Sequence, residues 1–218
     1  MFMAYKIPAT EELFPLLGEK ENRAQWGSID LWEGSDYDLS QHEGLHACIQ
    51  DQLRAAGARI GYGGYLEKRT IYQRSDHFKE SGELRNIHLG CDIWAQVGQT
   101  IFAPLAGEVH SFAYNAAPFD YGATLIVKHE WSEGSCYALY GHIQKSDIEG
   151  IERGDPIHRG QVICHLGDLD ENGGWVPHLH FQLICDINDY EGDYPGVAPL
   201  SQLPFYRKNC PDPTFWLL

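Results

Sequence analysis

The sequence lacks both a long apolar run and a concentration of basic residues. No stretch approaches the roughly 20 apolar residues that a membrane-spanning helix needs, so membrane insertion is not expected. The chain has 16 lysines and arginines against 31 aspartates and glutamates, and its formal net charge is −15. Nucleic acids and anionic membrane surfaces are bound by concentrated basic faces, so we expect no nucleic-acid partner.

Methionine and closely spaced cysteines are also scarce. Only 2 methionines stand against 23 glycines and 12 tyrosines, which favours strands and turns over a helical bundle. The six cysteines contain no Cys-x-x-Cys pair that would indicate a zinc knuckle or a redox motif. Most have apolar neighbours, so we expect buried reduced thiols, although an even number also allows three disulfides.

A secretory leader is not evident. The stretch from Met1 to Leu17 carries one lysine and is interrupted by two prolines and two glutamates, so it lacks the apolar centre of a signal peptide. As written, the chain is expected in the cytoplasm. It is expected in the periplasm or outside the cell if a leader has been removed.

We divide the chain into three parts. A length of 218 residues with 43% hydrophobic content suffices for one substantial core and a small appendage. Residues 1–84 are predicted to form an N-terminal appendage with short helices and a Tyr/Gly-rich segment. Residues 85–187 are predicted to form a β-domain, and residues 188–218, rich in proline, aspartate and aromatics, a tail packed on its surface.

Two helices are predicted in the appendage. One begins near Thr10, before Glu11 and Glu12. The second carries a capping-box pattern at Ser40 and Glu43, and its apolar residues recur at helical spacing until Gly57.

The Tyr/Gly-rich segment begins at Gly61 and superficially resembles a nucleotide-binding loop. A phosphate cradle follows a strand and opens a helix, whereas this segment runs into residues 65–72, which read as a strand. We therefore reject the phosphate-binding interpretation.

The remainder is dominated by short β-segments separated by turns. Eight candidate strands cover residues 91–95, 100–104, 107–114, 123–129, 136–143, 155–158, 161–165 and 178–185. Short strands without long helices between them predict a mainly β fold, an antiparallel sandwich or barrel-like arrangement.

The last of these strands carries His178 and His180. Alternate side chains of a strand share a face, so both imidazoles project together while Leu179 and Phe181 fill the other side. A zinc site needs at least three protein ligands, so this pair requires partners. A second pair, His42 and His46, is spaced for one helix face, but no third ligand accompanies it and solvated side chains are expected.

Partners for the strand pair are available in the segment His88-Leu89-Gly90-Cys91-Asp92. If this segment is extended, His88 and Asp92 lie on the same side, with Gly90 between them offering no obstruction. Imidazole and carboxylate both suit zinc, and one more histidine completes three ligands and leaves a position for water, as in catalytic sites. His142 ends another predicted strand, Tyr140-Gly141-His142.

These three motifs, in this order, resemble those of the lysostaphin-type zinc metallopeptidases, a family of peptidoglycan endopeptidases. The resemblance covers roughly residues 85–187. It implies that His88, Asp92 and His180 bind one zinc ion per chain and that His142 and His178 are catalytic histidines. Which of the two is the base and which stabilises the oxyanion stays open.

The resemblance also implies a peptide or peptidoglycan-fragment substrate, either of the peptidoglycan type or containing D-amino acids or glycine. Candidate substrate contacts are Arg85, Trp175 and Tyr114. The loop 172–175 and two C-terminal segments are similar to peptidase-like modules attached to aminotransferases, which implies association with a larger enzyme assembly.

Two departures and two alternatives remain. The lead-in loop differs from the Ser/Thr-Gly of many relatives, and Gln182 stands where glutamate is common. One alternative is a non-catalytic metal-binding or partner-activating module of the same fold. The other is a phosphocarrier with the same hybrid β-architecture, but such proteins do not need the segment from His88 to Asp92.

Overall fold

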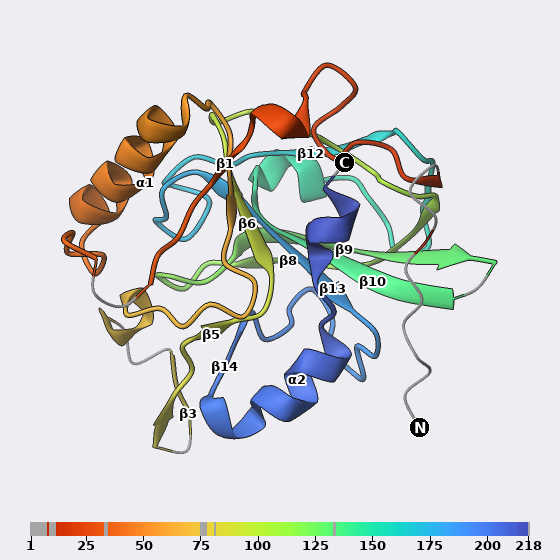
Figure 1. The fold of residues 1–218 in the computed structure, drawn as a ribbon. Coiled ribbons are helices and arrows are strands. Elements are labelled where there is room, and N and C mark those ends of the chain that lie inside the picture. The colour runs from red at the N-terminus through yellow and green to blue at the C-terminus, as the bar shows by residue number, and fades with distance from the viewer. Residues whose placement is uncertain are drawn as a thin grey trace.

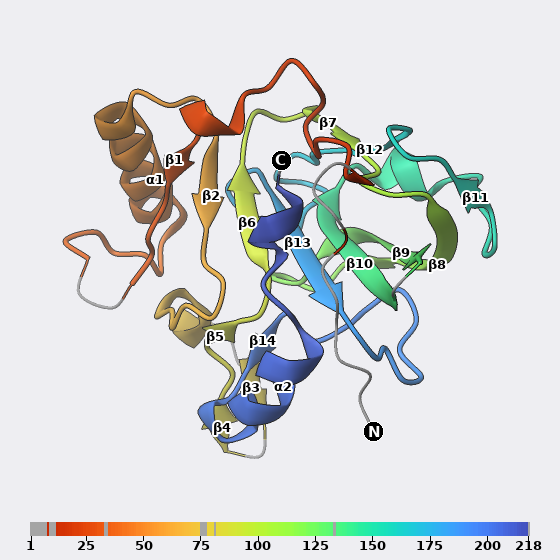
Figure 2. The ribbon, with the colours of Figure 1, turned by 45° about the vertical axis from the view of Figure 1, so that its right-hand side comes forward.

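The computed structural model describes residues 8, 12–32, 35–74, 78–80, 82–132 and 134–217. Its centre is an eight-stranded sheet in the order β1-β2-β6-β13-β10-β9-β8-β11 (Figures 1 and 2). These strands are β1 (Gly27–Ser28), β2 (Gly61–Gly63), β6 (Cys91–Trp94), β13 (His178–Ile184), β10 (Gly134–Ile143), β9 (Gly122–Trp131), β8 (Gly107–Asn115) and β11 (Pro156–Ile157). All neighbours in this sheet pair antiparallel except β1 and β2.

Three two-stranded sheets complete the strands in the described part of the chain. They pair β12 (Val162–His165) with β7 (Thr100–Phe102), β14 (Val197–Ala198) with β5 (Ile87–His88), and β3 (Lys79–Glu80) with β4 (Glu83–Leu84). The predicted mainly β fold is confirmed, and each of the eight predicted strands is present with shifted ends.

The helices are few. They are α1 (His42–Ala56) and α2 (Leu203–Asn209), with short 3-10 segments η2 (Arg23–Gln25), η3 (Ile71–Arg74), η5 (Lys145–Ile148), η6 (Leu200–Gln202) and η7 (Pro213–Trp216). Helix α1 lies beside β1 at one end of the large sheet, and α2 lies near β5 and β14 (Figure 2). Within the described residues, no helix is both long and apolar enough to cross a membrane.

Strand β13 lies in the interior of the sheet, between β6 and β10, and all seven of its residues are buried. Leu179, Phe181 and Leu183 contribute to the main hydrophobic core, as the alternation predicts. The opposite face presents His178 and His180. This central strand therefore joins the core to the histidine cluster.

The N-terminal part shares a core with the β-domain. Leu45, Ile49 and Leu53 of α1 belong to one buried cluster with Trp94 and Trp175. The C-terminal segment is similarly integrated, because β14 pairs with β5 and Trp216 is buried in the main core. Both flanks are thus part of the packing around the sheet.

Helix α1 was predicted correctly in its extent but not in its cap. The helix begins at His42, Gln41 is its N-cap, and no side chain caps it. Ser40 instead donates to Asp38 Oδ1 at 2.6 Å. Gly57 ends the helix in the left-handed conformation at φ 62°, as expected for a glycine that follows a helix.

Two other predictions differ from the structure. The start of the first predicted helix, at Thr10 and Glu11, lies outside the described residues, and the described residues before His42 contain no α-helix. Residues 65–72 do not form a strand: Gly64 and Leu66 have φ of 93° and 56°, which is incompatible with extended backbone, and η3 follows. The strand at this place is β2, which includes Gly61.

All six cysteines are free, and five are buried. Burial raises the pKa of the Cys164 and Cys136 thiols well above the ordinary value. The expectation of reduced, packed thiols agrees with this arrangement.

Candidate metal centre and active site

Three adjacent strands bring the predicted site together. In the pairing of β6 with β13, Asp92 lies directly opposite His180, and in the pairing of β13 with β10, His180 lies opposite Gly141. His88 enters from β5. The segment from His88 to Asp92 is not one extended strand, because it passes from the β5–β14 sheet into the large sheet.

The three predicted ligands nevertheless converge. His88 Nε2 lies 3.2 Å and His180 Nδ1 3.3 Å from Asp92 Oδ1, and the two ring nitrogens lie 2.9 Å apart. Among the described residues, these three side chains form the group of potential ligands with donor atoms within 4.8 Å of one another. A Cβ on Gly90 would lie 2.7 Å from His180 Nε2, so glycine is needed here.

Each of the two predicted ligand histidines has its outer ring nitrogen within hydrogen-bonding distance of an oxygen. His88 Nδ1 lies 2.9 Å from the carbonyl oxygen of Gly64, which can only accept. His180 Nε2 lies 2.9 Å from Gln182 Oε1, and the amide of Gln182 donates to the Pro195 carbonyl. These contacts assign the protons to the outer nitrogens and leave lone pairs on His88 Nε2 and His180 Nδ1.

The donor set fits a zinc ion. Two imidazole lone pairs and a carboxylate oxygen face one another in a buried site, and Asp92 Oδ1 has no hydrogen-bond partner. A buried carboxylate oxygen without a donor is costly unless a cation binds it. His88, Asp92 and His180 would hold the metal, and two histidines with one carboxylate are a known set for catalytic zinc.

His142 lies next to this centre at a β-bulge. Its φ is 64°, uncommon for a residue other than glycine, and the register of β10 with β9 shifts between Gly141 and Ile143. Such strain costs on the order of 1–3 kcal/mol and is typical of functional sites. The backbone is held by hydrogen bonds from His142 N–H to the Tyr121 carbonyl and from Gly167 N–H to the His142 carbonyl.

His142 and His178 each have ring atom Nδ1 bound to a backbone carbonyl oxygen. His142 Nδ1 donates to the Asn172 carbonyl at 2.8 Å, and His178 Nδ1 donates to the Val176 carbonyl at 2.7 Å. Their ring centroids are 4.4 Å apart. Each therefore presents Nε2, with its lone pair, as the nitrogen available to a substrate or water.

Burial disfavours the charged form of three imidazoles in the site, those of His88, His142 and His178. It lowers the pKa of His88 to about 4, and it lowers the pKa of His178 and, further, of His142. Burial opposes ionisation of Asp92 as well, but its contacts with the His88 imidazole and the Arg69 guanidinium hold the pKa of its carboxyl well below the ordinary value. Neutral imidazole and ionised carboxylate are the forms that bind a metal.

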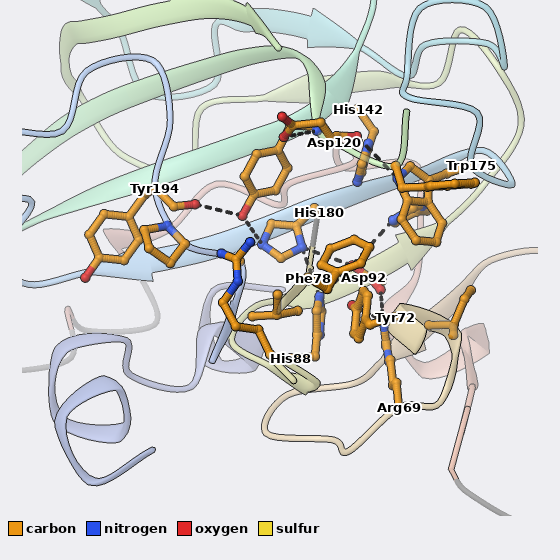
Figure 3. A pocket seen from close by; sticks show the side chains of 18 of the residues that line it. Arg69, Tyr72, Phe78, His88, Asp92, Asp120, His142, Trp175, His180 and Tyr194 are labelled. Atoms are coloured by element: carbon orange, nitrogen blue, oxygen red, sulfur yellow. Dashed lines mark hydrogen bonds and ion pairs between the residues drawn. The ribbon is translucent and has the colours of Figure 1, made fainter. Parts of the chain in front are cut away.

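The site opens into a pocket with a volume of about 380 Å³. Figure 3 shows His180 and Asp92 in the middle of the lining side chains, with His142 and Trp175 beside them. Arg85 and Trp175, both predicted substrate contacts, line it. Tyr114 is not among the lining residues in the described part of the chain; it lies under the Lys145 ammonium, 4.8 Å from its ring centroid.

The remaining histidines in the described part of the chain lie outside this cluster. His42 and His46 on α1 have ring centroids 6.4 Å apart, and neither belongs to the group of potential ligands among the described residues. His129 is fully buried, with Nδ1 3.1 Å from the Ala106 carbonyl, in agreement with a structural role. His77 lies outside the described residues.

Sequence reasoning missed three supporting residues. Asn172 is fully buried, and its side chain accepts from Gly174 and Trp175 N–H groups while its carbonyl holds His142. Arg69 contacts Asp92, and Gly64 holds His88. The Asn172-Gly173-Gly174 run was a signal for a tight turn; Arg69 could be proposed from the sequence to line an approach to a site, but nothing local indicated its contact with Asp92.

Residues 86–190 match the model of Peptidase family M23. This part of the chain is an M23 peptidase domain. Membership of a peptidase family supports peptide hydrolysis as the activity. No curated protein matches the chain.

Solved structures of other proteins match part of this chain. The catalytic domain of the antimicrobial peptidase lysostaphin from Staphylococcus simulans has 21% identity and a TM-score of 0.39, and the match covers 58% of this chain and 82% of that chain. LytU has 23% identity and a TM-score of 0.40, with 70% and 91% covered. A zinc-containing peptidase from Vibrio cholerae has 21% identity and a TM-score of 0.39, with 56% and 31% covered.

Proposed function

We propose that the chain is a zinc-dependent metallopeptidase that hydrolyses a peptide bond in a peptidoglycan-type peptide or in another peptide containing D-amino acids or glycine. The observation that carries this proposal is the convergence of His88, Asp92 and His180 around a carboxylate oxygen without a hydrogen-bond donor. The M23 domain match supports it independently.

In the proposed reaction, a bound metal would activate the water, and His142 and His178, which are not among the proposed ligands, would transfer protons or stabilise the oxyanion. When bound, zinc lowers the pKa of a coordinated water toward about 7 and polarises a carbonyl. His142 and His178 are neutral, buried and held by backbone carbonyls, so each Nε2 is ready to accept a proton. One of them takes the proton of the attacking water, and the other stabilises the oxyanion or protonates the leaving amine.

The pocket suits a short stretch of peptide. One side is formed by aromatic rings, of which all but Phe119 are buried: Tyr72 packs on Phe78 with centroids 4.7 Å apart, and Trp175 packs on the partly buried Phe119 at 5.7 Å. Arg85 adds a cationic side chain to the lining. Aromatic faces provide apolar contact with defined geometry, and a guanidinium can receive a carboxylate, so both groups are proposed substrate contacts.

Hydrolysis of defined peptides tests this function. We expect the zinc-loaded chain to cleave at least one member of a panel of peptidoglycan fragments and free peptides with glycine or D-alanine, with products identified by mass spectrometry. His142→Ala and His178→Ala should retain zinc and lose about 10²- to 10⁴-fold in rate, the range for removing a general acid or base.

His46→Ala is the matched control, because His46 is exposed on α1 and distant in sequence from the site motifs. It should leave the rate unchanged. A zinc-loaded chain that cleaves no peptide would instead favour the non-catalytic metal-binding module, and unchanged rates in both site variants would contradict the roles assigned to His142 and His178.

A further inference from the structure

A buried arginine contacts the proposed metal ligand Asp92. Arg69 is 3% exposed, and its Nη1 lies 2.6 Å from Asp92 Oδ2. Asp92 thus has its two oxygens in different environments: Oδ1 faces the imidazoles, and Oδ2 faces the guanidinium. A carboxylate bound on one oxygen cannot rotate freely, so Arg69 fixes the direction in which Oδ1 points.

Arg69 is itself held by Glu67. Arg69 Nε lies 2.5 Å from Glu67 Oε2, and Glu67 Oε1 accepts the Leu31 N–H at 2.8 Å. A continuous set of contacts therefore joins the segment after β1 to the carboxylate of Asp92. Figure 3 shows Arg69 reaching Asp92 from below the pocket.

The same segment also holds His88. The Gly64 carbonyl accepts from His88 Nδ1, and backbone hydrogen bonds join Leu66 N–H to the His88 carbonyl and His88 N–H to the Glu67 carbonyl. Residues 64–69 thus contact two of the three ligands. They lie before residue 86, where the match to the M23 family model begins.

The packing leaves no room for change at Gly64. Its φ is 93°, and an added Cβ would lie 1.9 Å from Arg69 Nη2 and 3.1 Å from His88 Nδ1. Glycine is required both for the left-handed backbone and for the approach of the guanidinium.

We propose that residues 64–69 are the outer support of the metal centre, with Arg69 orienting Asp92 and Gly64 fixing the tautomer of His88. This inference rests on the proposed zinc site. Arg69 is a positioning residue: it reaches the metal only through Asp92. Zinc affinity consequently depends on a segment that is not part of the matched peptidase domain.

The experiment measures the zinc dissociation constant of the full chain by competition with a chromophoric chelator. The main variant is E67Q/R69M, which removes one negative and one positive charge, so the net charge near the metal is unchanged. We expect zinc to bind about 10- to 100-fold more weakly, the usual effect of losing an outer contact to a ligand. Arg69→Lys keeps the charge but not the forked contact, and should lie between the variant and the wild type.

Gly64→Ala provides a second, independent test and has a matched control. Gly154 has φ of 90°, with nothing within 4 Å of an added Cβ. Gly154→Ala therefore introduces the same backbone strain without the collision. We expect Gly64→Ala to weaken zinc binding and Gly154→Ala to leave it unchanged.

Urea unfolding of each metal-free variant separates loss of support from loss of folding. If E67Q/R69M does not fold, Arg69→Lys and Gly64→Ala decide the question. Folded variants that bind zinc within about 3-fold of the wild type, a difference below 1 kcal/mol, overturn the inference. Failure of the wild-type chain itself to bind zinc overturns the proposed function instead.

Discussion

At the scale of single residues, the two histidines of β13 differ because of their neighbours. A strand presents His178 and His180 equally, so their roles could not be derived from spacing alone. In the structure, Gln182 lies two residues further along the same face and accepts from His180 Nε2, which turns Nδ1 toward Asp92. His178 donates instead to Val176.

The contacts of Gln182 explain how glutamine can stand at a position where glutamate is common in relatives. Its amide nitrogen donates to the Pro195 carbonyl and contacts Cys210 Sγ, so its oxygen is directed at His180. A neutral carbonyl oxygen thereby supplies the acceptor that a glutamate would provide. The ligand set itself could be predicted from the family resemblance, but this orientation required the fold.

The buried His129 makes the protein sensitive to acid. Burial lowers the pKa of His129 from 6.5 to about 4. The unfolded chain therefore takes up a proton below pH 6.5 that the folded chain does not, and stability falls as the pH drops from about 6.5 to about 4. Above pH 6.5 both states are neutral at this position, so His129 contributes no pH dependence there.

The variant His129→Gln tests whether His129 contributes to the loss of stability in acid. One proton corresponds to about 1.4 kcal/mol per pH unit, so between pH 4 and 6.5 the free energy of unfolding should fall less steeply in the variant by about this amount. Urea unfolding of the metal-free proteins at several pH values measures it. Parallel pH profiles for variant and wild type would assign the acid sensitivity to other groups.

At the scale of elements, β13 determines both the core and the site. Its alternating pattern was predictable, because Leu179, Phe181 and Leu183 recur with period two and fill the main core. The partners of β13 were not predictable from local sequence. The register that sets Asp92 opposite His180 joins residues far apart in the chain.

Local patterns also failed where tertiary contacts prevailed. The segment 65–72 has strand-forming residues, yet the turn at Gly64 and the ion pair of Arg69 with Asp92 hold it in another conformation. The edge strands β1 and β14 are two residues long and carry no periodic signal. Their positions follow from pairing with β2 and β5.

Phe181→Ala tests the contribution of β13 to the hydrophobic core. Phe181 is fully buried, and its ring packs on Tyr140 and Trp216 with centroids 5.3 and 6.4 Å away. Truncation should lower the free energy of unfolding by about 3–5 kcal/mol, measured in urea. Phe215→Ala, at a ring 55% exposed, is the control and should change it by less than about 0.5 kcal/mol. Equal losses in the free energy of unfolding for the two variants would contradict the role of Phe181 in the core.

At the scale of the whole molecule, the pocket draws on all parts of the chain. Leu31 and Tyr72 line it from the N-terminal part, His178 from the matched domain, and Val197 and Tyr206 from the C-terminal segment. The sequence placed the proposed metal ligands and catalytic histidines within the domain. It did not indicate that both flanks line the pocket, because that follows from packing between distant segments.

In the proposed function, peptide hydrolysis depends on one zinc ion bound by His88, Asp92 and His180. Titration of metal-free protein with zinc, while bound metal and peptide hydrolysis are both followed, tests this most directly. Both signals should rise together and level off at about one zinc per chain, and Asp92→Ala should show neither. Metal-free protein that hydrolyses peptide at the full rate, or wild-type protein that refuses added zinc, would contradict the account.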